Sequence, residues 1–172
     1  MKTIYLTGFM GAGKTTIGKA LAERMKVEVI DLDDYIEEKH NMDIPSIFQQ
    51  KGESYFRDEE QQALEEVPKH DVIITTGGGA VLREANRAYM KEHGYIINLE
   101  ADVETIYERI SERDNRPLAK GKSKAEMAQL LEKRQPFYRE GHLTVKTDDK
   151  PIDEIVEEII QWIKQTEFDE NE

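Results

Sequence analysis

Residues 8–15 read Gly-Phe-Met-Gly-Ala-Gly-Lys-Thr and match the pattern G-x-x-x-x-G-K-[ST] in full. The β-prone run at residues 2–7 precedes this octapeptide, and helical apolar spacing follows it from residue 16 onward. A strand, a glycine turn and a helix start are the three parts of a phosphate-binding loop. The glycines let backbone N–H groups approach an anion, and the helix N-terminus adds partial positive charge. The stretch therefore predicts a binding site for a nucleoside triphosphate.

The residue types within this loop indicate particular contacts. Lys14 is placed to reach the β- and γ-phosphates, and the Thr15 hydroxyl is placed to hold Mg²⁺. The nucleotide-binding residues that we expect here are Gly11, Ala12, Gly13, Lys14, Thr15 and Thr16. The alternative is a plain glycine-rich turn before an ordinary helix, and the strand–loop–helix context disfavours it.

Composition excludes several classes of function. The 172 residues suit a single domain, and 24 Lys plus Arg against 36 Asp plus Glu give a net charge of −12. A chain this acidic is not expected to bind nucleic acid or an anionic membrane, because both need a basic field. The chain has no cysteine, which excludes disulfides, thiolate catalysis and cysteine-based zinc sites. Without a membrane-spanning apolar run or room for a signal segment before Gly8, we expect a cytoplasmic protein, and we expect a monomer.

Short apolar runs alternate with helical patterns along residues 1–172, which predicts an α/β fold with a parallel sheet. We expect strands at residues 3–7, 28–31, 72–75, 95–99 and 142–145. We expect helices at residues 14–25, 34–41, 45–51, 53–66, 83–92, 102–112, 123–134 and 152–165. The acidic tail, residues 167–172, is expected to be a flexible, solvated end.

Two stretches interrupt the alternation. Residues 34–66 hold two or three helices without a strand between them, and residues 112–124 are polar and rich in charge. Beside a phosphate site, the first is expected to be a substrate-binding helical insertion and the second a lid. An extra helical layer and a plain surface loop are the alternatives.

Two carboxylates close the second apolar run in the sequence Asp31-Leu32-Asp33. Alternate residues of an extended segment point the same way, so Asp31 and Asp33 are expected to face one cleft at the end of a strand. Phosphoryl transfer to an alcohol needs one carboxylate near Mg²⁺ and another that accepts the hydroxyl proton. Asp34 is instead expected to cap the helix that begins near Tyr35.

The triplet Gly77-Gly78-Gly79 follows the apolar run at residues 72–76. Three consecutive glycines lose much backbone entropy on folding. We therefore expect that something at this position requires a backbone without side chains. Close approach of a substrate or of the γ-phosphate is the favoured explanation, and a simple turn is the alternative.

Three arginines are candidates for binding. Arg57 either forms a surface pair with Glu60, three residues on, or binds a ligand, and the pattern leaves both open. Arg109 either stacks on a base or lies on a solvated helix face. Arg116 precedes Pro117 in the expected lid, where it can close over the phosphates and stabilise charge in the transition state.

A fourth arginine, Arg134, opens the sequence Arg-Gln-Pro-Phe-Tyr near the last predicted strand. We expect Pro136 to end a helix there and to fix the direction of the chain. Pattern alone gives Arg134 no further role.

Together these stretches resemble the shikimate kinase family over nearly the whole chain. The P-loop alone is unspecific, whereas Gly-Glu-x-x-Phe-Arg, the glycine triplet and Arg-x-Pro-x-Tyr are highly specific in combination. The stretches that carry the resemblance are residues 8–15, 31–37, 47–60, 77–80, 116–118 and 134–138.

The resemblance implies a nucleoside-monophosphate-kinase-like P-loop fold, in which helices flank a five-stranded parallel sheet beside a helical shikimate subdomain and a lid. It implies transfer of the ATP γ-phosphoryl group to the 3-hydroxyl of shikimate, a step in chorismate and aromatic amino-acid biosynthesis. It makes Asp33 the residue that holds and orients the substrate hydroxyls. It implies that Arg57 and Arg134 bind the shikimate carboxylate. It also implies that Gly78, with its neighbours Gly77 and Gly79, lies behind the shikimate ring.

On the nucleotide side, the resemblance implies one Mg²⁺ bound by Thr15 and reached by Asp31 through water. It also implies that Arg116 contacts the phosphates and that Arg109 lies against adenine. The catalytic residues are then expected to be Lys14, Asp33 and Arg116.

Two other functions remain as alternatives. A gluconate-type kinase also acts on a substrate with a carboxylate and hydroxyls, and the glycine triplet with the Arg134-x-Pro-x-Tyr138 motif disfavours it. A non-catalytic ATP-dependent binding module is disfavoured because Lys14, Asp33 and Arg116 are all present.

Overall fold

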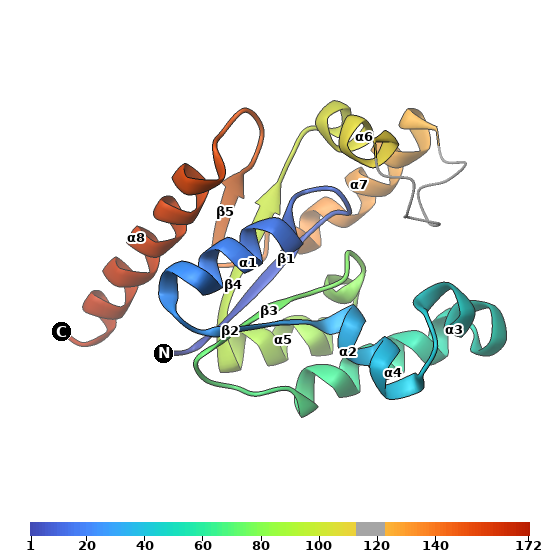
Figure 1. Ribbon diagram of the computed structural model, residues 1–172, viewed down its shortest axis with the longest axis horizontal. Coiled ribbons are helices and arrows are strands. Elements are labelled where there is room, and N and C mark those ends of the chain that lie inside the picture. The colour runs from blue at the N-terminus through green and yellow to red at the C-terminus, as the bar shows by residue number, and fades with distance from the viewer. Residues whose placement is uncertain (113–122) are drawn as a thin grey trace.

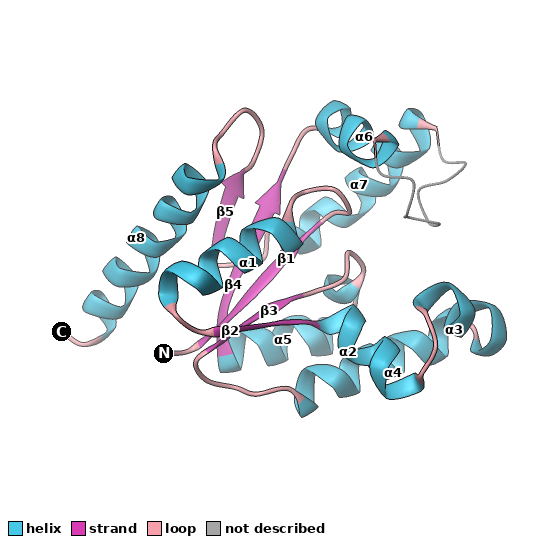
Figure 2. Cartoon of the chain, in the orientation of Figure 1, coloured by secondary structure: helices cyan, strands magenta, loops and turns pink. Residues whose placement is uncertain are grey.

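The computed structural model describes residues 1–112 and 123–172, and their strands form one parallel sheet in the order β2-β3-β1-β4-β5 (Figures 1 and 2). The strands are β1 (Thr3–Gly8), β2 (Glu28–Asp31), β3 (Val72–Thr75), β4 (Gly94–Glu100) and β5 (Leu143–Lys146). The helices are α1 (Lys14–Met25), α2 (Leu32–His40), α3 (Ile44–Lys51), α4 (Glu53–Glu66), α5 (Glu84–His93), α6 (Val103–Ser111), α7 (Lys124–Tyr138) and α8 (Ile152–Glu170), with a 3₁₀ turn η1 (Ala80–Leu82). The predicted α/β class and five-stranded parallel sheet are confirmed.

Alternating residues of the strands build the two sides of the core. Ile4 and Leu6 face a cluster formed with α1 and α8, whereas Tyr5 faces a cluster formed with α2 to α7. This period of two is the geometry of a strand covered on both faces, and it explains why every residue of β1 is buried. Figure 1 shows α1 and α8 lying together across one side of the sheet.

The strand order reverses at β1, because β2 and β3 lie on one side of it and β4 and β5 on the other. In an open α/β sheet, ligands bind outside the carboxyl ends of the strands at such a reversal. Gly8 ends β1 at φ 146°, where a Cβ would collide with the Leu99 carbonyl oxygen. The phosphate-binding loop thus leaves the sheet at its topological switch point.

Two expectations about helix ends are wrong. Helix α2 begins at Leu32, and its cap is Asp31, whose Oδ1 accepts from the Asp34 N–H at 3.0 Å, rather than Asp34. Helix α7 continues through Pro136 to Tyr138. Proline there costs a backbone hydrogen bond, which burial of the Tyr138 ring and packing of Phe137 offset.

The acidic tail is helical as far as Glu170, because α8 extends to that residue. The Glu170 carboxylate accepts from Lys2 Nζ at 2.9 Å and from the Tyr95 hydroxyl at 2.9 Å. These bonds tie the end of α8 to the amino-terminal ends of β1 and β4 and thereby limit fraying.

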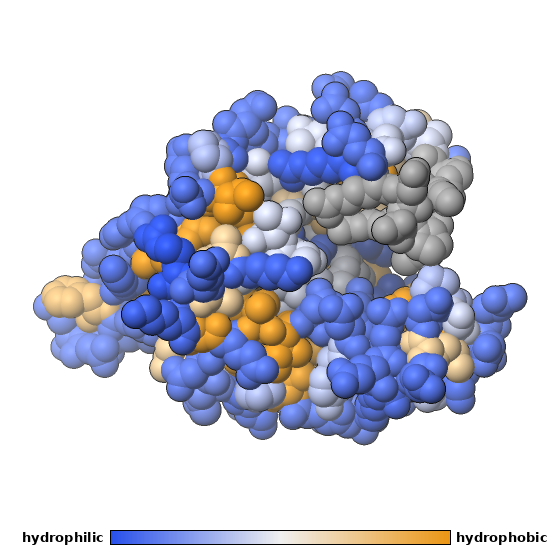
Figure 3. All heavy atoms as spheres, in the orientation of Figure 1, coloured by the Kyte–Doolittle hydropathy of each residue, from blue (hydrophilic) through white to orange (hydrophobic). Residues whose placement is uncertain are grey.

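Residues 34–66 fall in α2, α3 and α4, which pack on one another beyond the edge strand β2 (Figure 1). Part of the expected lid, including Arg116, lies outside the described residues. Within residues 1–112 and 123–172, no helix has the length and apolar character needed to cross a membrane. Polar side chains cover most of the face in Figure 3, with apolar ones between them in its middle.

Candidate active site

The P-loop has the geometry of an anion site. Gly11 and Gly13 take φ angles of 78° and 104°, which side-chain-bearing residues rarely adopt. Gly13 precedes α1 without a side-chain cap, so the first N–H groups of the helix remain available to an anion. Thr15 and Thr16 are exposed in this first turn. The loop therefore offers backbone donors and two hydroxyls on the same side.

Lys14 is held over the start of its own loop. Its Nζ donates to the Phe9 carbonyl oxygen at 3.0 Å and also to the Gly8 carbonyl oxygen. Lys14 lines the cavity outside the loop, so its ammonium group lies at the edge of the space predicted for the phosphates.

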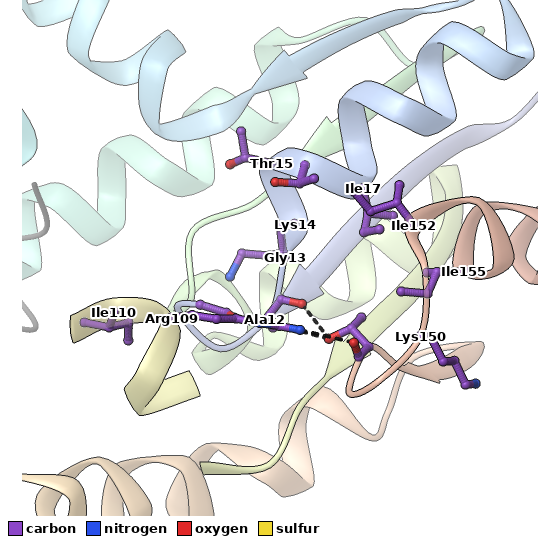
Figure 4. Close-up of a pocket in the computed structure, with 13 residues that line it drawn as sticks. Ala12, Gly13, Lys14, Thr15, Ile17, Arg109, Ile110, Lys150, Ile152 and Ile155 are labelled. Atoms are coloured by element: carbon purple, nitrogen blue, oxygen red, sulfur yellow. Dashed lines mark hydrogen bonds between the residues drawn. The ribbon is translucent and has the colours of Figure 1, made fainter. Parts of the chain in front are cut away.

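A cavity of about 250 Å³ opens beside the P-loop and is shown in Figure 4. Its lining includes all six of the nucleotide-binding residues predicted between residues 11 and 16, together with Arg109. The other lining residues are Ile17, Ile110, Thr147, Lys150, Ile152 and Ile155.

Arg109 is tied into the wall of this cavity. Its Nη1 donates to the Gly11 carbonyl oxygen at 3.0 Å, and its Nη2 donates to the Thr147 carbonyl oxygen at 3.1 Å. The Thr147 hydroxyl in turn donates to the Ala12 carbonyl oxygen at 2.9 Å (Figure 4). Arg109 is therefore not a solvated helix residue, and it joins the P-loop to the segment after β5. Thr147 was not among the predicted site residues, because its only signal in the sequence is its place just beyond a strand.

Asp33 lies in the first turn of α2, against the glycine triplet. A Cβ on Gly77 would stand 2.8 Å from Asp33 Oδ1. Burial, with smaller effects from Asp31 and Glu60, raises the pKa of Asp33 to about 7. The expectation that Asp31 and Asp33 alternate along one extended segment is wrong, because the strand ends at Asp31 and Asp33 is helical. The two carboxylates nevertheless lie near enough for Asp31 to raise the pKa of Asp33.

Arg57 forms the pair with Glu60 that its sequence allowed, but the pair is buried rather than on the surface. Its Nη1 pairs with Glu60 Oε1 at 2.9 Å, and the Glu60 side chain is fully buried. The same guanidinium lies against the glycine triplet, where a Cβ on Gly79 would stand 2.5 Å from Arg57 Nη1. Only a bare backbone fits beside the guanidinium, which explains the third glycine. Glu60 was named only as the possible surface partner of Arg57, because its burial is not visible in the sequence.

Arg134 approaches the triplet from α7. A Cβ on Gly78 would stand 3.3 Å from Arg134 Nη1, and the guanidinium lies 5.8 Å from the centroid of the Phe9 ring. The same Cβ would lie 3.6 Å from the Met10 backbone nitrogen, so this region adjoins the P-loop. The structure thus brings α2, α4, the glycine triplet and α7 together beside the phosphate site.

Four charged side chains in the described part of the chain have a buried polar atom without a hydrogen-bond partner there, and all four lie in this region. They are Asp33 Oδ1, Arg57 Nε, Glu60 Oε2 and Arg134 Nε. Buried polar atoms are almost always satisfied, so such a cluster indicates a ligand site. Two guanidiniums and a carboxylate suit a small molecule that carries a carboxylate and hydroxyl groups.

A P-loop at the switch point of a parallel sheet, beside a buried cluster of two arginines and an aspartate, defines a P-loop kinase of small molecules. The chain belongs to the shikimate kinase family, because the family model described as "Shikimate kinase" matches residues 10–164. The members of this family are ATP-dependent phosphotransferases, and neither of the two alternative functions is favoured.

Similarity to individual proteins supports the same family. A shikimate kinase of Bacillus cereus (strain AH187) is 44% identical over 165 residues, which cover 96% of this chain and 100% of that protein. The structure of shikimate kinase from Acinetobacter baumannii in complex with shikimate is 37% identical, with a TM-score of 0.90 over 96% of this chain and 94% of that one. A gluconokinase structure from Sinorhizobium meliloti is 16% identical with a TM-score of 0.64, over 98% of this chain and 97% of that one, and so shares the fold alone.

Proposed function

We propose that this chain transfers the γ-phosphoryl group of ATP to the 3-hydroxyl of shikimate, giving shikimate 3-phosphate and ADP. The observation that carries the proposal is the cluster beside the P-loop in which the unpartnered buried atoms of Asp33, Arg57 and Arg134 lie against a bare glycine backbone. Shikimate has one carboxylate and three hydroxyls; the two guanidiniums complement the carboxylate, and the Asp33 carboxylate can accept from a hydroxyl.

ATP is proposed to occupy the cavity of about 250 Å³, with its phosphates on the P-loop backbone and on Lys14. Arg109 would lie against adenine, because it lines this cavity and is held there by its bond to the Gly11 carbonyl oxygen. Arg116, outside the described residues, is proposed to contact the phosphates.

The residues at the P-loop fit one Mg²⁺. The Thr15 hydroxyl is an exposed oxygen ligand, and oxygen is the ligand that Mg²⁺ prefers. Asp31 accepts from Thr75 Oγ1 at 2.8 Å and from the Asp34 N–H at 3.0 Å, so we propose that it reaches the ion through water. The described part of the chain has no cluster of three His, Cys, Asp or Glu residues for a metal, which suits an ion held mainly by phosphate and water. When bound, the ion would neutralise charge on the β- and γ-phosphates.

On the acceptor side, Arg57 and Arg134 would bind the shikimate carboxylate from two directions. Asp33 would hold the 3-hydroxyl toward the γ-phosphate. The hydroxyl oxygen forms the new bond to phosphorus as the bond to the β-phosphate oxygen breaks, and the hydroxyl proton passes to Asp33. The transition state of such transfers is loose, so alignment and charge stabilisation matter more than a strong base. A carboxyl whose pKa is about 7 is matched to accept this proton near neutral pH.

We further propose that the chain acts in the cytoplasm as a monomer, with ATP and shikimate as its small-molecule substrates. Its net charge of −12 supports the absence of nucleic-acid and membrane partners.

The test is a coupled ADP-release assay with Mg-ATP and one of shikimate, quinate, gluconate or no acceptor. Fast turnover with shikimate alone is expected, because quinate and gluconate also carry a carboxylate and hydroxyls but arrange them differently in space. Turnover with gluconate at a similar rate, or ADP release indifferent to the acceptor, would contradict the proposal.

A further inference from the structure

The middle of the glycine triplet is bonded to α7. The Tyr138 hydroxyl donates to the Gly78 carbonyl oxygen at 2.5 Å, across 60 residues of sequence. The Tyr138 side chain is only 3% exposed, and burial raises its pKa to about 12. The phenol is therefore a neutral donor throughout the physiological pH range.

Backbone bonds also hold this turn: the Ala80 N–H donates to the Gly77 carbonyl oxygen at 3.2 Å, and the Leu82 N–H donates to the Gly79 carbonyl oxygen at 3.1 Å. Before the triplet, the Thr76 N–H donates to the Leu6 carbonyl oxygen at 3.0 Å. After it, Asn86 Nδ2 donates to the Ala80 carbonyl oxygen at 2.9 Å. Among the described residues, the Tyr138 hydroxyl is the side chain that bonds the triplet between these points. Consecutive glycines have the greatest backbone freedom, so their orientation depends strongly on such a bond.

The geometry of the peptide bond links this contact to the substrate pocket. The Gly78 carbonyl and the Gly79 N–H belong to one planar trans peptide, so they point in opposite directions. When Tyr138 holds the carbonyl, the Gly79 N–H is directed away from Tyr138. No hydrogen-bond acceptor for this N–H is present among the described residues. The peptide also lies between the two guanidiniums, with Arg134 beside Gly78 and Arg57 beside Gly79.

We propose that Tyr138 is a positioning residue for shikimate binding: its hydroxyl orients the Gly78–Gly79 peptide so that this backbone and Arg134 form one binding surface. Tyr138 acts through the peptide and does not itself contact the substrate. Arg134 and Tyr138 lie one helical turn apart on α7, so the same helix delivers the guanidinium and the hydroxyl that fixes its backbone neighbour. The inference rests on the proposed function, because shikimate is the ligand of this surface.

The test is Tyr138→Phe, which removes one oxygen and keeps the buried ring. We expect the KM for shikimate to rise about five- to tenfold, which is what the loss of one buried hydrogen bond costs. We expect the KM for ATP to stay within twofold, because the P-loop and its cavity keep their contacts. A purely structural role would instead shift the KM values for shikimate and for ATP together, and that result would overturn the inference.

The matched control is Tyr95→Phe. The Tyr95 ring is 2% exposed and its hydroxyl donates to Glu170 at 2.9 Å, but it lies at the other end of the sheet. We expect this variant to lose stability like Tyr138→Phe and to keep both KM values.

A double variant with Arg134→Lys tests whether the two residues act on one surface. If they do, Tyr138→Phe raises the shikimate KM by less than threefold when Arg134 is already replaced. A full five- to tenfold rise in that background, or an unchanged shikimate KM in Tyr138→Phe alone, would overturn the inference. Turnover of the unmodified enzyme with shikimate tests the proposed function separately, so the two failures are distinguishable.

Discussion

The two halves of the site are built by different means. The nucleotide half is a contiguous loop, residues 8–16, that offers backbone N–H groups and one lysine to a cavity. The acceptor half gathers Asp33, Arg57 and Arg134 from three helices that lie far apart in the sequence. Its charged groups are buried and partly unpartnered, whereas Thr15 and Thr16 on the nucleotide side are exposed. A loop can therefore offer an anion site by local geometry, whereas a site for a polyhydroxy acid needs residues that only the tertiary structure brings together.

The largest effect is expected from Lys14→Ala. The lysine ammonium stabilises charge on the transferred phosphoryl group, so its loss should lower kcat by about a thousandfold or more. Because the acceptor half does not use Lys14 for binding, the Kd for shikimate in calorimetric titration should change less than threefold. A large loss of shikimate affinity would show that the two halves are not separate.

Asp33→Asn is expected to lower kcat by about a hundredfold, since it removes the group that aligns the hydroxyl and accepts its proton. Burial raises the pKa of Asp33 to about 7, and the carboxylate is the form that acts in the proposed mechanism. In the unmodified enzyme kcat/KM for shikimate should therefore rise with pH through about 7 and then level off. This acidic limb should be absent in Asp33→Asn, as measured by initial rates between pH 5.5 and 8.5. If the pH profile of kcat/KM in Asp33→Asn kept its acidic limb, the titrating group would be a residue other than Asp33.

Gly79→Ala tests the bare backbone of the acceptor half. The new Cβ would stand 2.5 Å from Arg57 Nη1, so the guanidinium must move, and we expect the KM for shikimate to rise about tenfold. The matched variant is Gly78→Ala, whose Cβ would lie 3.3 Å from Arg134 Nη1 and should have a smaller effect. Equal effects on the KM values of shikimate and ATP would contradict the separation of the two halves.

His142 lies outside both halves of the site, and its replacement is expected to have the smallest effect. Its Nδ1 accepts from the Ile96 N–H at 2.9 Å, so the folded state needs the neutral ring. Partial burial, with nearby Lys91 and Lys2 and against Glu170, lowers the pKa of His142. A lowered pKa means that this contribution is fully present above the unfolded-state pKa of about 6.5 and is lost as pH falls through the folded-state pKa.

Between pH 7 and pH 5, the free energy of unfolding should therefore fall less in His142→Leu than in the unmodified protein. The difference should be less than about 1 kcal/mol, because the ring is partly exposed to solvent. Urea denaturation at both pH values measures the difference, and kcat should not change. Identical pH dependence in the two proteins would refute this role.

The difference between the halves also explains what the sequence could predict. The P-loop and the five strands follow from local patterns, because turn geometry and a period of two are local properties. The roles of Arg57 and Arg134 came only from family resemblance, since no local pattern reveals that Glu60 is buried beside Arg57. Thr147 was missed because its contact with Ala12 spans 135 residues.

Tertiary contacts override a local preference at two helix ends. Pro136 lies inside α7 rather than at its end, because Phe137 and Tyr138 beyond it pack into the core. The acidic tail is helical to Glu170, because Lys2 and Tyr95 bind that carboxylate. Such partners lie far away in the sequence, and only the fold brings them together.

The most direct test of the account is calorimetric titration of Arg57→Ala with shikimate and, separately, with Mg-ATP. We expect the affinity for shikimate to fall at least tenfold, because a buried charged partner of the shikimate carboxylate is lost. We expect the affinity for Mg-ATP to stay within twofold. Near-normal affinity for shikimate in Arg57→Ala would contradict the assignment of the acceptor half.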